Sequence, residues 1–195
     1  MAYKKEALNK AILDYLHSIR KSYYSRPLAE NEARNDELRP GYLIVTGFDP
    51  ANPLHTRNIS NGSKHSLVGH QLNGDLRYLL ESKLTYKDGA ILISEDGQLH
   101  RIGARLLNLK SPNAIARELG LQILDNESET FGFASEVNTR HINALYASHL
   151  MPGTIVITMS GKTGDIRMYE KGRIIDSTVE GEPKKSLEAI VRNPY

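Results

Sequence analysis

The stretch DGAILISEDG, residues 88–97, places four apolar residues between two Asp-Gly pairs. A short apolar run bounded by turn residues is typical of a buried strand. The second pair, Asp96-Gly97, is a dipeptide that reverses a hairpin whose two central residues take positive φ. We therefore predict a strand at residues 90–94 that turns back into a second strand, QLHRIGARLLNL, at residues 98–109.

Three further segments predict strands on either side of this hairpin. They are GYLIVTGF at residues 41–48, GTIVITMS at residues 153–160, and DIRMYEKGRII at residues 165–175, a closing hairpin turned at Lys171-Gly172. Leucines at residues 72–80 predict a short helix, residues 139–150 predict a longer one, and the polar residues 49–67 are interpreted as a connection. Hairpins combined with crossovers predict an α/β domain, in which a mixed β-sheet is flanked by helices.

The N-terminal segment has the pattern of an amphipathic helix. Its apolar residues recur at intervals of mostly three and four, and they are Leu8, Ile12, Tyr15, Leu16, Ile19 and Tyr23. We expect this stripe to pack on the main domain or on a partner subunit. Residues 25–40 are polar and are interpreted as a linker. The sequence thus divides into an N-terminal helix and linker, residues 1–40, and a main domain, residues 41–195.

Composition limits the classes of protein that the chain can belong to. The 195 residues are 39% hydrophobic and 25% charged, as expected for a globular protein. The net charge is +2 and the basic residues form no arm, so no nucleic acid partner is evident. No stretch approaches the roughly 18 apolar residues of a membrane span, and no signal peptide is evident, so we expect a cytoplasmic protein without a membrane partner. The absence of cysteine excludes disulfides and thiolate chemistry.

The segment NTRHINAL, residues 138–145, places Thr139, Arg140 and His141 at the predicted start of a helix. Unpaired backbone N–H groups and the helix dipole favour an anion there, and the guanidinium and imidazole groups would add a phosphate site. The alternative is an Asn or Thr cap followed by two solvated side chains.

The segment SGKTGD, residues 160–165, follows a predicted strand and resembles part of a P-loop. A P-loop requires a glycine five positions before Gly161-Lys162-Thr163, where Val156 stands, and the following segment is strand-like, so a P-loop is excluded. Two interpretations remain: a plain hairpin turn, or a turn whose hydroxyl, glycine and lysine groups contact phosphate. The scattered histidines, without an HExxH pattern, predict no zinc site.

Taken in order, three motifs resemble the diadenylate cyclase (DAC) domain family, the nucleotidyltransferase domain of the DNA integrity scanning protein. The motifs are DGAILI at residues 88–93, TRH at residues 139–141 followed by Ala144, and IVITMSGKTGDIRMYEKGRI at residues 155–174. The resemblance covers roughly residues 41–174. It implies a diadenylate cyclase that binds ATP and joins two ATP molecules into cyclic di-AMP, with release of pyrophosphate. It also implies a divalent metal, Mg²⁺ or Mn²⁺, and a homo-oligomer in which two domains meet face to face.

The resemblance also implies roles for individual residues. Asp88 would hold the metal and serve the attacking 3′-hydroxyl, and it would act with Arg140 and His141 as a catalytic residue. The nucleotide-binding residues would be Gly89, where the backbone approaches the nucleotide, Ala90 on the adenine side, Thr139 on the triphosphate, and Ser160, Lys162 and Thr163 on the opposite wall.

The sequence departs from the family pattern at three places. Ile142 replaces the second arginine of the TRHR motif, with Asn138 before the motif in place of glycine. Gly161 and Lys162 stand where the family commonly has two acidic residues. Residues 105–137 are longer than expected, and their acids would either supply a metal ligand or belong to a solvated loop. Two alternatives to a cyclase therefore stay open: a catalytically degenerate DAC-like domain that binds or senses an adenine nucleotide, and a structural or oligomerisation module.

Overall fold

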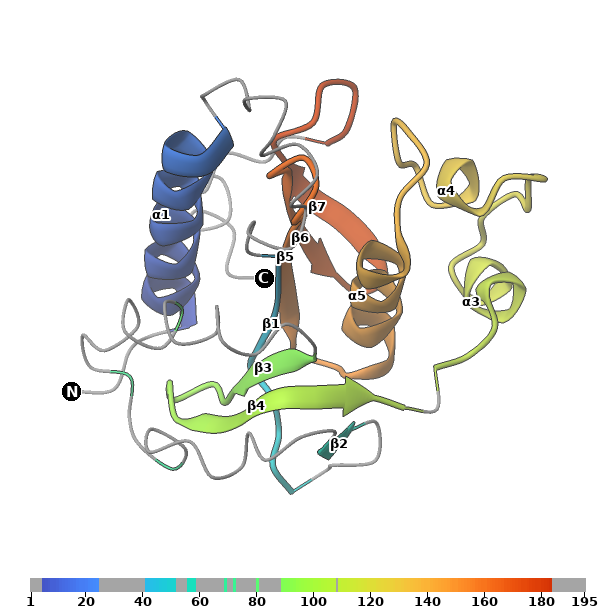
Figure 1. The fold of residues 1–195 in the computed structure, drawn as a ribbon. Helices are drawn as coiled ribbons and strands as arrows, with labels where there is room; N and C mark the ends of the chain where they lie inside the picture. Colours follow the sequence, from blue (N-terminus) through green and yellow to red (C-terminus); the bar gives the residue numbers. More distant parts are fainter. Residues whose placement is uncertain are drawn as a thin grey trace.

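A computed structural model describes residues 5–24, 41–51, 56–58, 69, 72, 80, 89–107 and 109–183. These residues form a seven-stranded sheet in the order β2-β4-β3-β1-β5-β6-β7. The strands are β1 (Tyr42–Thr46), β2 (Thr56–Asn58), β3 (Ala90–Ile93), β4 (Leu99–Leu106), β5 (Ile155–Met159), β6 (Ile166–Glu170) and β7 (Arg173–Ser177). β1 pairs with β3 in parallel, whereas the other neighbours are antiparallel. The predicted α/β fold with a mixed sheet is confirmed (Figure 1).

The predicted hairpins form, but one turn differs from its prediction. At Lys171-Gly172 both residues have positive φ, 50° and 73°, as a two-residue turn between β6 and β7 requires. Between β3 and β4, Gly97 has a φ of 85°, whereas Asp96 does not have positive φ. The Ser94 amide donates to the Gln98 carbonyl oxygen, so the loop holds three residues instead of two. The prediction of positive φ at both Asp96 and Gly97 was therefore wrong.

The interpretation of residues 49–67 as a connection was incomplete. Within them, Thr56–Asn58 forms β2, which pairs antiparallel with β4 through Thr56 opposite Leu106. A three-residue polar strand shows no apolar alternation, so no pattern in the sequence predicts it. The helix predicted at residues 72–80 lies outside the described residues, except for Leu72 and Leu80, which are both fully buried.

Helix α1 (Lys5–Tyr24) covers one face of the sheet (Figure 1). Its buried stripe includes Leu8, Ile12 and Leu16, all with no exposed surface. These side chains belong to the same hydrophobic cluster as the inward-facing residues of the sheet, which include Ile44, Ile91, Ile157, Met159, Ile166 and Met168. Helix α1 therefore packs on the sheet of its own chain.

Helix α5 (Thr139–Leu150) covers the opposite face of the sheet (Figure 1). It shares a second hydrophobic cluster with Leu43, Val45, Val156 and Tyr169 of the sheet. The observed bounds of α5 are the predicted ones.

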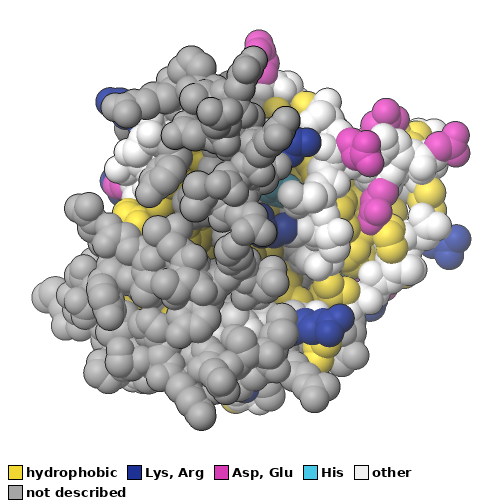
Figure 2. Space-filling view, in the orientation of Figure 1, with side chains coloured by type: hydrophobic (Ala, Val, Ile, Leu, Met, Phe, Trp, Pro, Cys, Tyr) yellow, Lys and Arg dark blue, Asp and Glu magenta, His cyan; other side chains and the backbone are white. Residues whose placement is uncertain are grey.

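The long segment at residues 105–137 contains two short helices, α3 (Pro112–Glu118) and α4 (Glu127–Thr130). Ile115, Phe131 and Phe133 anchor it in the cluster under α5. Acidic side chains gather on the surface near α4 (Figure 2), where Asp125, Glu129 and Glu136 are exposed, whereas Glu127 accepts a hydrogen bond from the Tyr146 hydroxyl. The segment is thus a packed excursion with a solvated acidic surface.

None of the helices in the described ranges has the length and apolar character that crossing a membrane requires.

Candidate functional site

The end of the sheet at which β1 begins brings together three sequence motifs. Tyr42 pairs with Met159, so Ser160 leaves β5 beside the start of β1. The parallel pairing of Ile44 with Ile91 puts Gly89 at the same end of β3. Arg140, in the first turn of α5, lies against Gly41, because a Cβ on Gly41 would be 2.9 Å from the Arg140 Cζ atom. The described parts of the DGA, TRH and SGKTGD motifs therefore lie at the same end of the sheet.

The N-terminus of α5 is capped by Asn138. Its Oδ1 atom accepts a hydrogen bond from the Arg140 amide at 3.1 Å, which satisfies one of the free N–H groups of the first turn. Thr139 is exposed and Arg140 is partly buried. The structure therefore contains the Asn cap that the sequence analysis gave as an alternative to an anion site. The Arg140 guanidinium lies against Gly41, just before β1.

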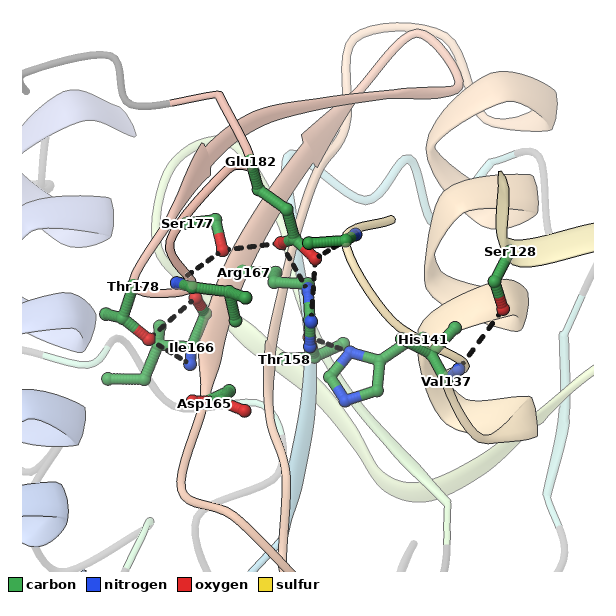
Figure 3. Close-up of polar contacts among 12 residues, drawn as sticks. Ser128, Val137, His141, Thr158, Asp165, Ile166, Arg167, Ser177, Thr178 and Glu182 are labelled. Atoms are coloured by element: carbon green, nitrogen blue, oxygen red, sulfur yellow. Dashed lines mark hydrogen bonds and ion pairs between the residues drawn. The ribbon is translucent and has the colours of Figure 1, made fainter. Parts of the chain in front are cut away.

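His141 points inward from the same turn and is only 2% exposed. Its Nδ1 atom lies 2.9 Å from the Thr158 Oγ1 atom (Figure 3). The same atom lies 3.0 Å from the Tyr169 hydroxyl oxygen. Burial lowers the pKa of His141 to about 3, and the positive charges of Arg167 and Arg140 act in the same direction. His141 is therefore neutral at physiological pH and links α5 to β5 and β6 by hydrogen bonds.

A buried ion pair, which the sequence analysis missed, lies next to His141 (Figure 3). The Arg167 Nε atom is 2.7 Å from the Glu182 Oε2 atom, and its Nη2 atom is 2.8 Å from Oε1. Both side chains are almost fully buried, with exposures of 3% and 0%. Glu182 also accepts hydrogen bonds from the Ser177 hydroxyl at 2.6 Å and the Ala134 amide at 3.1 Å.

The two groups of this pair remain charged because their hydrogen bonds favour the charged forms by more than burial disfavours them. Burial alone would raise the pKa of Glu182, but the hydrogen bonds from Arg167, Ser177 and the Ala134 amide lower it. Burial likewise opposes the charged form of Arg167, yet the hydrogen bond to Glu182 leaves its pKa raised. The Arg167 guanidinium also lies 5.5 Å from the centre of the Phe133 ring. Fully paired charges of this kind hold three chain segments together.

The sequence carried partial signals of this polar cluster. Thr158 interrupts an apolar strand, and Arg167 alternates with Ile166 and Met168, so both could have been assigned to an unusual polar patch under α5. Glu182 follows the last strand in a polar segment, and nothing in the sequence pairs it with Arg167.

The SGKTGD segment forms a hairpin turn between β5 and β6, as one of its two interpretations proposed. The Ser160 Oγ atom accepts hydrogen bonds from the amides of Lys162 and Thr163, each at 3.2 Å. The Thr163 hydroxyl donates to Asp165 at 2.5 Å. Lys162 and Thr163 are exposed, whereas Ser160 is buried within the turn.

The DGA motif is described only in part, because Asp88 lies outside the described residues. Gly89 has a φ of 95°, and a Cβ there would lie 2.5 Å from the Gly103 carbonyl carbon of β4. Packing of β3 against β4 therefore requires this glycine, whether or not a ligand approaches it. Ala90 is fully buried in the cluster under α5.

The described residues do not make up a divalent metal site. Within those residues, no group of three or more His, Asp or Glu side chains could hold a metal ion. Asp165, the carboxylate in the Ser160 turn, accepts from Thr163 and lies 3.8 Å from Arg20. The neighbouring Lys162 offers no lone pair to a cation. Asp88, the metal ligand that the resemblance implies, lies outside the described residues.

Comparisons with known proteins show likeness only at the level of solved structures. No protein-family model and no curated protein matches the chain. A crystal structure of a hypothetical membrane spanning protein from Bacillus cereus is similar, with 18% identity and a TM-score of 0.44 over 88% of this chain and 70% of the other. A double mutant of DacA from Staphylococcus aureus is also similar, with 16% identity and a TM-score of 0.42 over 93% of each chain. These scores are too low to carry an argument about function.

Proposed function

We propose that this protein is a nucleotidyltransferase of the diadenylate cyclase class, which condenses two ATP molecules into cyclic di-AMP. The observation that carries the proposal is the meeting of three motifs at one end of the sheet. Gly89, Arg140 and Ser160 come from distant parts of the chain, and the pairing of β1 with β3 and β5 puts their elements side by side there. Their order along the chain is that of the DAC family.

In this proposal the N-terminus of α5 holds the triphosphate. Arg140 supplies a guanidinium at the positive end of the helix dipole, and Thr139 adds an exposed hydroxyl. Ser160, Lys162 and Thr163 would contact phosphate from the β5–β6 turn, and Gly89 would lie beside the adenosine. Ala90 is fully buried under α5, so the adenine-side role that the resemblance implies for it is not retained. His141, the third proposed catalytic residue, would act from its buried position by fixing the first turn of α5 to Thr158 and Tyr169.

The proposed reaction is two identical phosphoryl transfers. The 3′-oxygen of each ATP attacks the α-phosphorus of the other, a new P–O bond forms, and the bond to the β-phosphate breaks to release pyrophosphate. Asp88 would take the proton of the 3′-hydroxyl. Mg²⁺ or Mn²⁺, when bound by Asp88 and the phosphates, would neutralise charge on the leaving group. Because each site holds one ATP, two domains must meet face to face in a homo-oligomer.

A second candidate function is a DAC-like domain that binds or senses an adenine nucleotide without joining two of them. The observation that favours it is the neutral, buried state of His141 together with the buried Ile142, which is 8% exposed. The first turn of α5 consequently presents one positive side chain, Arg140, to a triphosphate.

The test is to incubate the purified protein with ATP and Mg²⁺ or Mn²⁺ and to detect cyclic di-AMP by mass-resolved chromatography. We expect product from the wild type and none from Asp88→Asn. Arg140→Gln should reduce synthesis about tenfold or more, because a charge-assisted contact to phosphate is lost. Arg117→Gln, at an exposed arginine of α3, is the matched control and should behave as wild type.

Each outcome separates the candidates. Saturable ATP binding without product would favour the nucleotide-binding alternative. Synthesis that survives Asp88→Asn would remove Asp88 from its proposed role. If the protein neither forms product nor binds nucleotide, both proposed functions are contradicted and the structural module remains.

A further inference from the structure

A pocket of about 320 Å³ lies between the second half of α1 and the β5–β6 turn. The described residues that line it are His17, Arg20, Lys21 and Tyr24 of α1 and Thr163 of the turn. The four helical residues are spaced at i, i+3, i+4 and i+7, so they form one continuous stripe beside the buried stripe of α1. The volume is at the lower end of the range for pockets that bind small ligands.

The described side chains that line this pocket include two cations, Arg20 and Lys21, and no carboxylate. Asp165 lies 3.8 Å from the Arg20 guanidinium, a long contact between partly exposed groups, and it also accepts from Thr163. Within the described part of the chain, neither His17 nor Lys21 makes an ion pair. Lys10 of the same helix differs, because it pairs with Asp14 at 2.9 Å.

Tyr24 connects the two sides of the pocket, α1 and the β5–β6 turn. Its hydroxyl donates to the carbonyl oxygens of Ser160 and Gly161, at 3.1 Å and 2.9 Å. These hydrogen bonds tie the end of α1 to the turn that carries Thr163. The cationic stripe and the Thr163 hydroxyl are therefore held at a fixed separation across the pocket.

We propose that this pocket binds the phosphate group of a small ligand, at a site separate from the N-terminus of α5. Arginine binds phosphate as a planar fork and lysine binds it as a point charge, and Arg20 and Lys21 supply these two groups here. The pocket lies on the α1 side of the sheet and shares only the β5–β6 turn residue Thr163 with the proposed nucleotide site, whereas Arg140 belongs to the helix on the opposite face. The inference does not depend on the proposed cyclase activity.

The test is isothermal titration of the full chain with inorganic pyrophosphate, without divalent metal, in a buffer of physiological ionic strength. We expect saturable binding in the wild type. The affinity should be about tenfold weaker in each of the single variants Arg20→Gln and Lys21→Gln, since each removes a charged donor. Lys10→Gln is the matched control, because it removes a positive charge from the same helix about 15 Å along the axis from Arg20, outside the pocket lining. Arg140→Gln tests whether the two sites are separate.

Loss of affinity in Arg20→Gln and Lys21→Gln, with wild-type affinity in Lys10→Gln and a retained pyrophosphate site in Arg140→Gln, would support the proposal. Equal losses in all three lysine and arginine variants of α1 would show general charge attraction and overturn it. The absence of saturable pyrophosphate binding would also overturn it. If Arg140→Gln abolished all pyrophosphate binding, a separate site would be excluded.

Discussion

The two faces of the sheet are buried in different ways. Under α1 the contacts of the described residues are mostly apolar, and the buried hydrogen bonds there include Thr46 with Asn9 at 2.7 Å and the Tyr42 hydroxyl with the Leu80 carbonyl oxygen at 2.9 Å. Under α5 the apolar cluster surrounds His141, Thr158, Arg167 and Glu182. One face is thus held by non-directional burial, whereas the other also depends on hydrogen bonds of defined geometry.

This difference indicates what each face contributes. Burial of leucine and isoleucine side chains supplies stability but tolerates small shifts. The contacts of His141 and Glu182 instead fix α5, β5, β6 and the segment that follows β7 in one arrangement. The α5 face is also the one whose helix begins at the candidate site. The hydrogen bonds of this face therefore fix the position of the first turn of α5, which carries Arg140.

The largest effect is expected on the α5 face, from Arg167→Ala. This change leaves the Glu182 carboxylate buried without its cation, which should lower the free energy of unfolding by about 3–5 kcal/mol. Urea unfolding at pH 7 measures the loss. The paired variant Arg167→Met with Glu182→Leu removes both charges and should lose much less. If Arg167→Ala cost under about 1 kcal/mol, the polar cluster would not be a structural element of this face.

The next largest effect is expected on the α1 face, from Leu16→Ala. Truncation of a fully buried leucine should lower the free energy of unfolding by about 3 kcal/mol, through lost burial and a residual cavity. The control is Lys10→Ala on the exposed side of α1, which should change stability by no more than about 0.5 kcal/mol. Equal effects of the two changes, in the same urea experiment, would show that α1 does not pack on the sheet in solution.

The α5 face should also make stability depend on pH. The pKa of His141 is about 3 in the folded protein and about 6.5 for an ordinary histidine, as in the unfolded chain, so between these values the unfolded chain binds a proton that the folded chain does not. Stability should therefore fall as pH decreases below about 6.5, by up to about 1.4 kcal/mol for each pH unit.

The measurement is urea unfolding of the wild type and His141→Gln between pH 7 and pH 5. The variant should show a shallower pH dependence. Glu182, whose pKa is lowered on folding, contributes stability that is lost only at more acidic pH, as its carboxylate is protonated in the folded state. Identical slopes in the two proteins would contradict the neutral, buried state of His141.

The smallest effect is expected at the N-terminus of α5, at the end of the sheet where the candidate site lies. Asn138→Ala removes the cap of α5 and should cost about 1 kcal/mol, whereas Asn138→Asp keeps an acceptor for the Arg140 amide and should cost less. Thermal unfolding followed by circular dichroism compares the two. Equal stability of both variants and the wild type would show that the cap does not hold the start of α5.

The sheet was predictable to the extent that its strands carry apolar runs or turn dipeptides. β1, β3, β5 and the hairpin at Lys171-Gly172 have such signals, whereas β2 has neither. The strand order was not predictable, because the pairing of β1 with both β3 and β5 depends on contacts between residues far apart in the chain.

For the candidate site, the sequence identified the segments but not their internal contacts. It marked the start of α5 and offered both a cap and an anion site, and the structure supplies the cap through Asn138. It placed His141 with solvated or ligand-binding groups, since helical periodicity does not show that Thr158 and Tyr169 lie opposite. The structural need for Gly89 came from Gly103, a partner on the neighbouring strand that spacing alone does not reveal.

The packing of α1 has a consequence for the order of events during synthesis. Residues 5–24 are translated early, but their apolar stripe is covered by strands as distant as β6, which ends at Glu170. At typical elongation rates of about 5–20 residues per second, roughly 7 to 30 s pass before those strands exist. The nascent helix must stay unaggregated during that interval, so we expect the chain to depend on chaperones while it is still on the ribosome.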